Sequence, residues 1–307
     1  MPQRFVFASH FNHRFNPEQQ VARVLWLDQH LRGGLKLPET PVSELKLGPT
    51  PSLRVVPAPG LPVARVEIYY AVDPDPRARF WRSPSVRRDG AAWIGALPVM
   101  DTKRPLFAFA NVLYRLPRPA ALPRNQQVNE VCLSTLFHEA KPAALQAADV
   151  KPAGKPDALI EDFKNGFRDW YTINGNHRTL WQHWTRKVTD PKWRGSAGAR
   201  LALTIHSEQP NVIGFVLKEN TWRGYRGKPR VYTAEARLKG RAPETVTLAL
   251  KDFRCTTDGA PPASWAELDE LGLVARHTVR GPKPRVLAAE DWRGAPPVFI
   301  RLEWLRD

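Results

Sequence analysis

The sequence predicts a mostly β protein with two β-sandwiches, preceded by a short N-terminal strand and helix. Thirty prolines among 307 residues, about twice the usual frequency, leave few places for a long helix. Short apolar runs that alternate with polar residues recur along the chain, with turn-forming residues between them. A hydrophobic content of 42% is enough for packed cores, and the length is typical of two domains.

One helix is expected, at residues 17–32. Pro17 suits the first helical turn, and the glycine pair that starts at Gly33 should end the helix. Apolar residues recur at helical spacing between Val21 and Leu31, so the helix has an apolar face that needs a partner surface.

The strands are expected in two groups. Residues 35–51 should form a Pro-rich connector before the first group. The segments 125–137 and 159–163 should bracket a Pro/Ala-rich stretch with little regular structure. In the second group, Leu201 and Leu203 should point inward, with Thr204 on the wet face. The first group predicts a small sandwich, with strands at residues 53–56, 63–72, 91–97 and 106–114. The second group predicts a larger sandwich, with strands at residues 200–206, 212–218, 230–238, 245–250, 271–277 and 298–305.

The formal net charge of +16 makes nucleic acid the first partner to consider. The basic residues are scattered from Arg4 to Arg306 without a long block, and no zinc-finger, helix-turn-helix or RNA-binding aromatic pattern is found, so nucleic acid is not favoured. Without an 18-residue apolar run, no membrane contact is expected. The expected compartment is cytoplasmic if Met1 is the true start, and secreted or periplasmic if the chain is a fragment of a longer protein.

The N-terminal segment resembles the end of an α/β-hydrolase domain. It combines a short strand, a loop histidine in the string NHRF and a helix that ends WLDQHLRGG, similar to bacterial dienelactone-hydrolase or acetylxylan-esterase-like proteins. In that family the loop histidine is the general base of a Ser-His-Asp triad, a role that the resemblance gives to His13. No G-x-S-x-G elbow is present, so residues 1–48 are expected to be the C-terminal remnant of such a domain.

Two further resemblances give the expected domain boundaries. The turn DPDP, the string ARFWR and the strand LFAFANVLY resemble the immunoglobulin-like module of the same family, which implies an immunoglobulin-like sandwich at residues 49–124. The strings IEDF and DWY, the motif KDF, the string SWAELDEL and a closing FIRLEW resemble a galactose-binding-like jelly roll, which implies that fold for residues 125–307.

A Trp-rich stretch at residues 159–194 directs attention to carbohydrate, because it holds four of the eleven tryptophans among polar side chains. Sugar binding needs flat apolar faces together with fixed hydrogen-bonding groups. Trp181 and Trp184 are three residues apart and would face opposite sides of a strand, so at most one lies on a given binding face. Burial in the core is an equally open alternative, and it is favoured for the framework tryptophans 170, 265 and 304. The candidate ligand-binding residues are Trp181, His183, Trp184, Trp222 and Tyr225.

A structural calcium ion is the one cofactor considered. Glu161 and Asp162 in the opening strand of the second sandwich could approach Glu303 in the closing strand and supply the oxygen ligands that Ca²⁺ prefers. The alternative is that these carboxylates are surface groups paired with arginine.

The expected function is that of a non-catalytic accessory region of an α/β-hydrolase-family protein. Its jelly roll would bind carbohydrate or pack against the catalytic domain. The alternative is part of an active carboxylic-ester hydrolase, with His13 as the triad base and with Ser and Asp supplied by sequence absent here. The expected partner is accordingly the carbohydrate or the ester substrate of the parent hydrolase.

Overall fold

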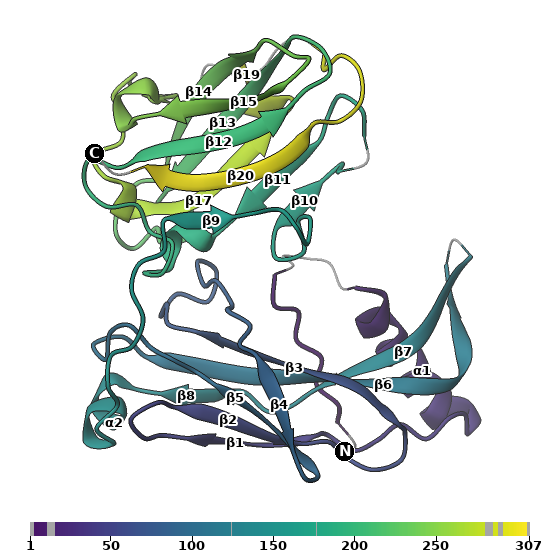
Figure 1. The fold of residues 1–307 in the computed structure, drawn as a ribbon. Coiled ribbons are helices and arrows are strands. Elements are labelled where there is room, and N and C mark those ends of the chain that lie inside the picture. The colour runs from purple at the N-terminus through teal and green to yellow at the C-terminus, as the bar shows by residue number, and fades with distance from the viewer. Residues whose placement is uncertain are drawn as a thin grey trace. The chain divides into compact units, whose positions relative to one another are not determined.

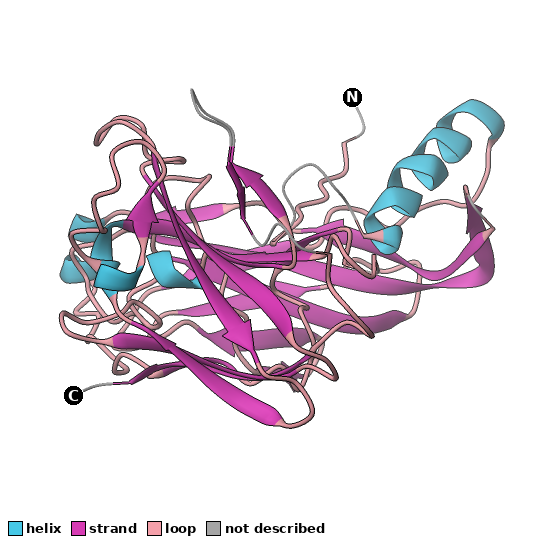
Figure 2. Cartoon of the chain, turned by 90° about the horizontal axis from the view of Figure 1, so that it is seen from above, coloured by secondary structure: helices cyan, strands magenta, loops and turns pink. Residues whose placement is uncertain are grey.

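The computed structural model describes residues 3–10, 16–123, 125–175, 177–279, 285–287 and 291–305. With 42% of residues in strands and 11% in helices, the protein is mostly β, as predicted (Figure 2). The chain divides into two compact units, which are Met1–Pro74 with Trp81–Gly154 and Asp75–Phe80 with Lys155–Asp307. No helix within the described ranges is long and apolar enough to cross a bilayer.

Unit 1 consists of two antiparallel sheets and two helices (Figure 1). Sheet A has the strand order β3-β6-β7, with β8 on β6, and sheet B has the order β1-β2-β5-β4. Side chains of both sheets share one core, as in a sandwich. The elements are α1 (Pro17–Arg32), β1 (Val42–Lys46), β2 (Ser52–Val56), β3 (Val63–Ala71), β4 (Val86–Asp89), β5 (Ala92–Ala96), β6 (Leu106–Leu122), β7 (Gln126–Ser134), β8 (His138–Ala140) and α2 (Pro142–Ala147).

The predicted helix α1 is confirmed, together with its start and end. Asn16 and Gln19 form a reciprocal capping box, Pro17 occupies the first turn, and Gly33 ends the helix in the left-handed conformation at φ 68°. The helix packs on β7 and β6 and buries Val21 in the core of unit 1. Part of its apolar face therefore has a partner within the described chain, whereas Val24 and Leu31 stay exposed, at 44% and 77%.

The predicted boundary at residues 124/125 differs from the one observed at Gly154. β7 pairs with β6 over most of its length, which places residues 126–134 in unit 1 and not with the second sandwich. β6 also runs past its predicted end at Tyr114, because a register shift between Arg115 and Ala120 accommodates the two prolines that would break a regular ladder. The predicted connector contains β1, an edge strand whose alternation is too weak to recognise in the sequence.

The described residues of unit 2 form two larger antiparallel sheets around one core and a small two-stranded one (Figure 1). Sheet C has the order β15-β12-β20-β9, and sheet D has the order β10-β11-β17-β13-β14-β16; β18 and β19 form a separate hairpin. The elements are β9 (Leu159–Glu161), β10 (Tyr171–Ile173), β11 (Gln182–Thr185), η1 (Lys187–Thr189), β12 (Arg200–His206), β13 (Asn211–Glu219), β14 (Arg230–Leu238), β15 (Pro243–Leu248), η2 (Leu250–Asp252), β16 (Arg254–Cys255), η3 (Trp265–Glu267), β17 (Leu268–Val274), β18 (His277–Val279), β19 (Arg285–Leu287) and β20 (Val298–Leu305).

The core of unit 2 confirms the alternation predicted for residues 200–206. Leu201 and Leu203 are buried between the sheets, whereas Thr204 is only partly buried. The three framework tryptophans, Trp170, Trp265 and Trp304, are all buried in the same core, as predicted. The immunoglobulin-like and jelly-roll assignments of the two sandwiches stay predictions.

The segment Asp75–Phe80 belongs to unit 2, although it lies in the chain between β3 and β4 of unit 1. Thr189 Oγ1 donates a hydrogen bond of 2.9 Å to the carbonyl of Ala78, and the rings of Phe80 and Trp193 meet edge to face at 5.1 Å. The chain therefore crosses between the units three times.

The close approach of Trp184 to Gly272 gives a stability prediction. These residues are cross-strand partners on β11 and β17, and a Cβ at Gly272 would come within 2.5 Å of the indole ring. Gly272→Ala should therefore lower the free energy of unfolding by about 1–3 kcal/mol, measured by denaturant titration. Gly224→Ala is the control, because a Cβ at Gly224 meets nothing within 4 Å. Equal stability of the two variants would contradict the packing described.

Candidate functional site

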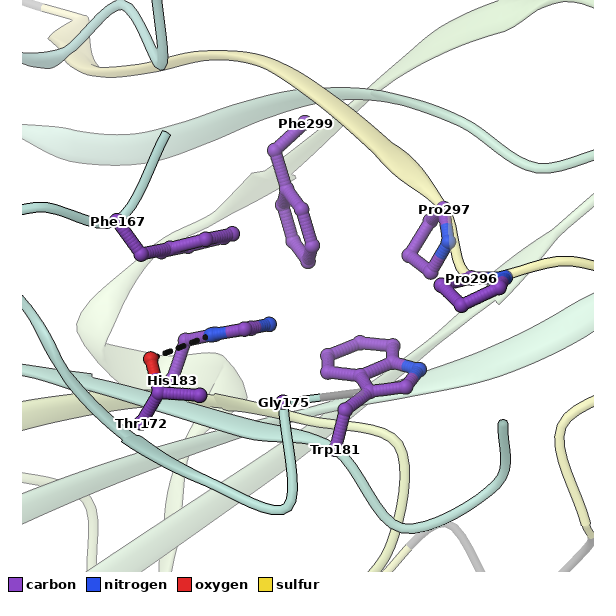
Figure 3. Close-up of a pocket in the computed structure, with 8 residues that line it drawn as sticks. All are labelled: Phe167, Thr172, Gly175, Trp181, His183, Pro296, Pro297 and Phe299. Carbon is purple, nitrogen blue, oxygen red and sulfur yellow. Dashed lines mark hydrogen bonds between the residues drawn. The ribbon is translucent and has the colours of Figure 1, made fainter. Parts of the chain in front are cut away.

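A cavity of about 320 Å³ lies within unit 2, between the edge strand β10 and its neighbour β11 in sheet D and strand β20 of sheet C. Its lining comes from three parts of the chain: the β9–β11 region, the residues just before β20, and β20 itself (Figure 3). The lining residues are Phe167, Thr172, Gly175, Trp181, His183, Pro296, Pro297 and Phe299.

Strand alternation brings two of the predicted ligand-binding residues to this cavity. Trp181 and His183 are two residues apart at the start of β11, so their side chains point to the same face. Both are buried, at 1% and 6% exposure, and both line the cavity. Trp184 belongs to the opposite face of sheet D, as its spacing from Trp181 predicted.

The imidazole of His183 is held between an aromatic wall and a hydroxyl group. Its ring stacks on Phe167 at a centroid distance of 3.6 Å and an interplanar angle of 4°. Nδ1 lies 3.1 Å from Thr172 Oγ1. The other ring nitrogen, Nε2, has no hydrogen-bond partner in the described chain and points into the hollow between Trp181 and Phe299 (Figure 3).

The cavity is uncharged at neutral pH. Burial lowers the pKa of His183 to about 4, and no other lining residue has an ionisable side chain. Trp181 Nε1 is a further buried donor without a partner in the described chain. The site can therefore hold an uncharged ring against flat apolar faces and give it a hydrogen bond from or to Nε2.

The other aromatic candidates do not line the cavity. Trp184 packs over Gly272 on the far face of sheet D, with Lys218 Nζ 3.9 Å from the centroid of its ring. Trp222 is partly buried below the guanidinium of Arg186, at 4.9 Å. Tyr225 is 68% exposed in the same loop as Trp222. The structure thus brings together two of the five predicted residues.

Sequence analysis did not identify Phe167 and Phe299 as site residues. They are more than 130 positions apart and lie in the loop before β10 and in β20. Their contact, with ring centroids 5.1 Å apart, results from the packing of the two sheets. No motif or spacing in the sequence could have revealed it.

The carboxylates predicted to hold calcium have cationic partners. Glu161 is 2.5 Å from Lys187 Nζ and accepts a 3.0 Å hydrogen bond from Trp170 Nε1. Asp162 pairs with Lys164 at 3.2 Å, and Glu303 pairs with Arg301 at 2.8 Å. In the part of the chain that the structure describes, no group of three or more His, Cys, Asp or Glu side chains is placed to hold a metal ion.

His13, the predicted relic of a catalytic base, lies outside the described residues. Comparison of the chain with protein-family models gave no match, and comparisons with curated proteins and with solved structures gave none either.

The buried imidazole predicts a pH dependence of stability. The pKa of His183 falls from about 6.5 in the unfolded chain to about 4 in the folded protein, so the unfolded state binds more protons between these values. The contribution to stability is complete above pH 6.5 and is lost as the pH falls toward 4, by about 3 kcal/mol. The free energy of unfolding, measured by denaturant titration, should therefore fall more steeply with decreasing pH for the wild type than for His183→Phe over this window. Parallel pH profiles of the two proteins would rule out a buried neutral imidazole.

The ion pairs of Lys187 predict a large effect on stability. Its ammonium is buried between Glu161 and Asp169, at 2.5 and 2.9 Å. Lys187→Met leaves Glu161 buried without its cation and should cost about 3–5 kcal/mol in the free energy of unfolding. Lys164→Met is the control: it removes the exposed partner of Asp162 and should leave the denaturation midpoint unchanged. If Lys187→Met lowered the free energy of unfolding only slightly, water would have to reach the ion pairs of Lys187.

Proposed function

We propose that unit 2 is a non-catalytic binding module whose cavity receives an uncharged ring of a carbohydrate ligand. The observation that carries the proposal is the unpartnered Nε2 of His183, aimed into a hollow with Trp181 on one wall and Phe299 on another. Flat apolar faces and a fixed hydrogen-bonding group are what recognition of such a ring requires.

The proposal also concerns the rest of the chain. Following the resemblance of its N-terminal segment, the chain is the accessory region of a larger α/β-hydrolase-family protein, and its partner is the carbohydrate on which that hydrolase acts. The lining of the cavity supports binding because its rings are buried and mutually packed, so the site is preorganised before a ligand arrives.

The proposal predicts which of the two aromatic regions binds. On an array of neutral glycans that includes aryl glycosides, His183→Phe keeps a flat ring but removes Nε2, and it should weaken binding about 3- to 10-fold, the equivalent of one neutral hydrogen bond. Tyr225→Ala is the control, because Tyr225 is exposed and does not line the cavity. If Tyr225→Ala abolished binding while His183→Phe bound normally, the loop that carries Trp222 and Tyr225 would be the binding surface instead.

The structural calcium ion at Glu161, Asp162 and Glu303 is a separate proposal. Such an ion would have to displace the lysine and arginine partners of these carboxylates. The Lys187→Met variant tests this as well, because removing the competing ammonium would then let calcium chloride raise its melting temperature, whereas no rise relative to a chelator would exclude calcium.

A further inference from the structure

We infer that the ring held in the cavity is an aromatic ring with a hydroxyl group, carried on the carbohydrate as a substituent, and not the sugar ring itself. The inference rests on the proposed function of unit 2 as a carbohydrate-binding module. It names the chemical group that the cavity selects.

The polar groups of the lining are too few for a buried sugar ring. Side-chain hydrogen bonding in the cavity comes from Nε2 of His183 and from Thr172 Oγ1, which is already bonded to Nδ1; Trp181 Nε1 is fully buried and does not face the hollow. A pyranose carries several hydroxyl groups, and each one buried without a partner costs about 1–3 kcal/mol. A phenolic ring buries one.

The orientation of the rings suits a planar guest. Phe299 stands almost perpendicular to the other aromatic walls, at 89° to Trp181, 82° to His183 and 84° to Phe167. A flat ring that enters beside Phe299 would meet it edge to face, an arrangement that aromatic rings prefer (Figure 3). A puckered pyranose gains less from an edge-to-face neighbour.

The hydroxyl group suits Nε2 whichever tautomer His183 adopts. If Thr172 donates to Nδ1, Nε2 carries the proton and donates; if Nδ1 donates to Thr172, Nε2 accepts. A phenol can accept from the first and donate to the second. The absence of charged side chains among the lining residues disfavours a carboxylate at the same position.

The size of the cavity agrees with a single ring. A buried apolar cavity of roughly 150 Å³ is enough to hold benzene. A volume of about 320 Å³ therefore leaves room for the hydroxyl group and for the bond that links the ring to the rest of the ligand.

The first experiment is a double-mutant cycle between the ligand and the protein. Dissociation constants of p-cresol and toluene, which differ by one hydroxyl group, are measured by NMR titration of the wild-type chain and of His183→Phe. We expect the wild type to prefer p-cresol about 3- to 10-fold and the variant to lose most of that preference, because the variant lacks Nε2. Tyr225→Ala should behave as the wild type. An equal preference in the wild type and His183→Phe would overturn the inference.

A measurement on the wild type covers the case in which His183→Phe does not fold. Long-range ¹H–¹⁵N spectra report the imidazole nitrogens directly, and p-cresol should shift Nε2 of His183 while toluene does not. A shift of equal size with both compounds would overturn the hydrogen bond to the hydroxyl group.

The second experiment separates the inference from the proposed function. It titrates the wild type with 4-hydroxyphenyl β-D-glucopyranoside and with methyl β-D-glucopyranoside, each in competition with p-cresol. If the aryl glucoside displaces p-cresol and the methyl glucoside does not, the result supports both the inference and the proposed function. Equal displacement by the methyl glucoside would overturn the inference and keep the proposed function. Binding of p-cresol but not of the aryl glucoside would remove carbohydrate and keep the aryl site, and no binding of any probe would remove both.

Discussion

The ion pairs of Lys187 hold the loop that forms one wall of the cavity in unit 2. The Lys187 ammonium pairs with Glu161 at the end of β9 and with Asp169 just before β10. The loop between these two carboxylates carries Phe167, so one cation holds both ends of the loop that forms a wall of the cavity. Because a buried charge is costly unless it is paired, the loop has little freedom to leave this position. The site is therefore supported by electrostatics several residues away from the rings that would touch a ligand.

Strand alternation is the second constraint, and it acts within a few residues of the first. Along β11, Trp181 and His183 face the core, while Trp184 faces the other side of sheet D and is closed off by Gly272 and Lys218. What looks in the sequence like one aromatic cluster is thus two clusters with different surroundings. Only the core-facing pair meets rings from β20 and borders a hollow.

Local signals in the sequence were enough to predict some of the local structure. The ends of α1 followed from Pro17 and Gly33, and the inward residues of β12 followed from simple alternation. The extent of unit 1 could not be predicted in this way, because the pairing of β7 with β6 crosses two prolines and a register shift. For the site, Trp181 and His183 could be predicted from residue type and spacing, whereas Phe167 and Phe299 join them only through tertiary packing. The charge partners of Glu161 were equally out of reach, since no spacing relates them to Lys187.

The segment Asp75–Phe80 is synthesised long before the rest of unit 2, to which it belongs. Ala78 and Phe80 are made about 110 residues before Thr189 and Trp193, their partners in unit 2. The ribosome has therefore already released the six-residue segment, tethered at both ends by strands of unit 1, when the second core begins to assemble. A chain that began at Lys155 would lack these partners, so the two units cannot be separated by a single cut without leaving part of the second one behind.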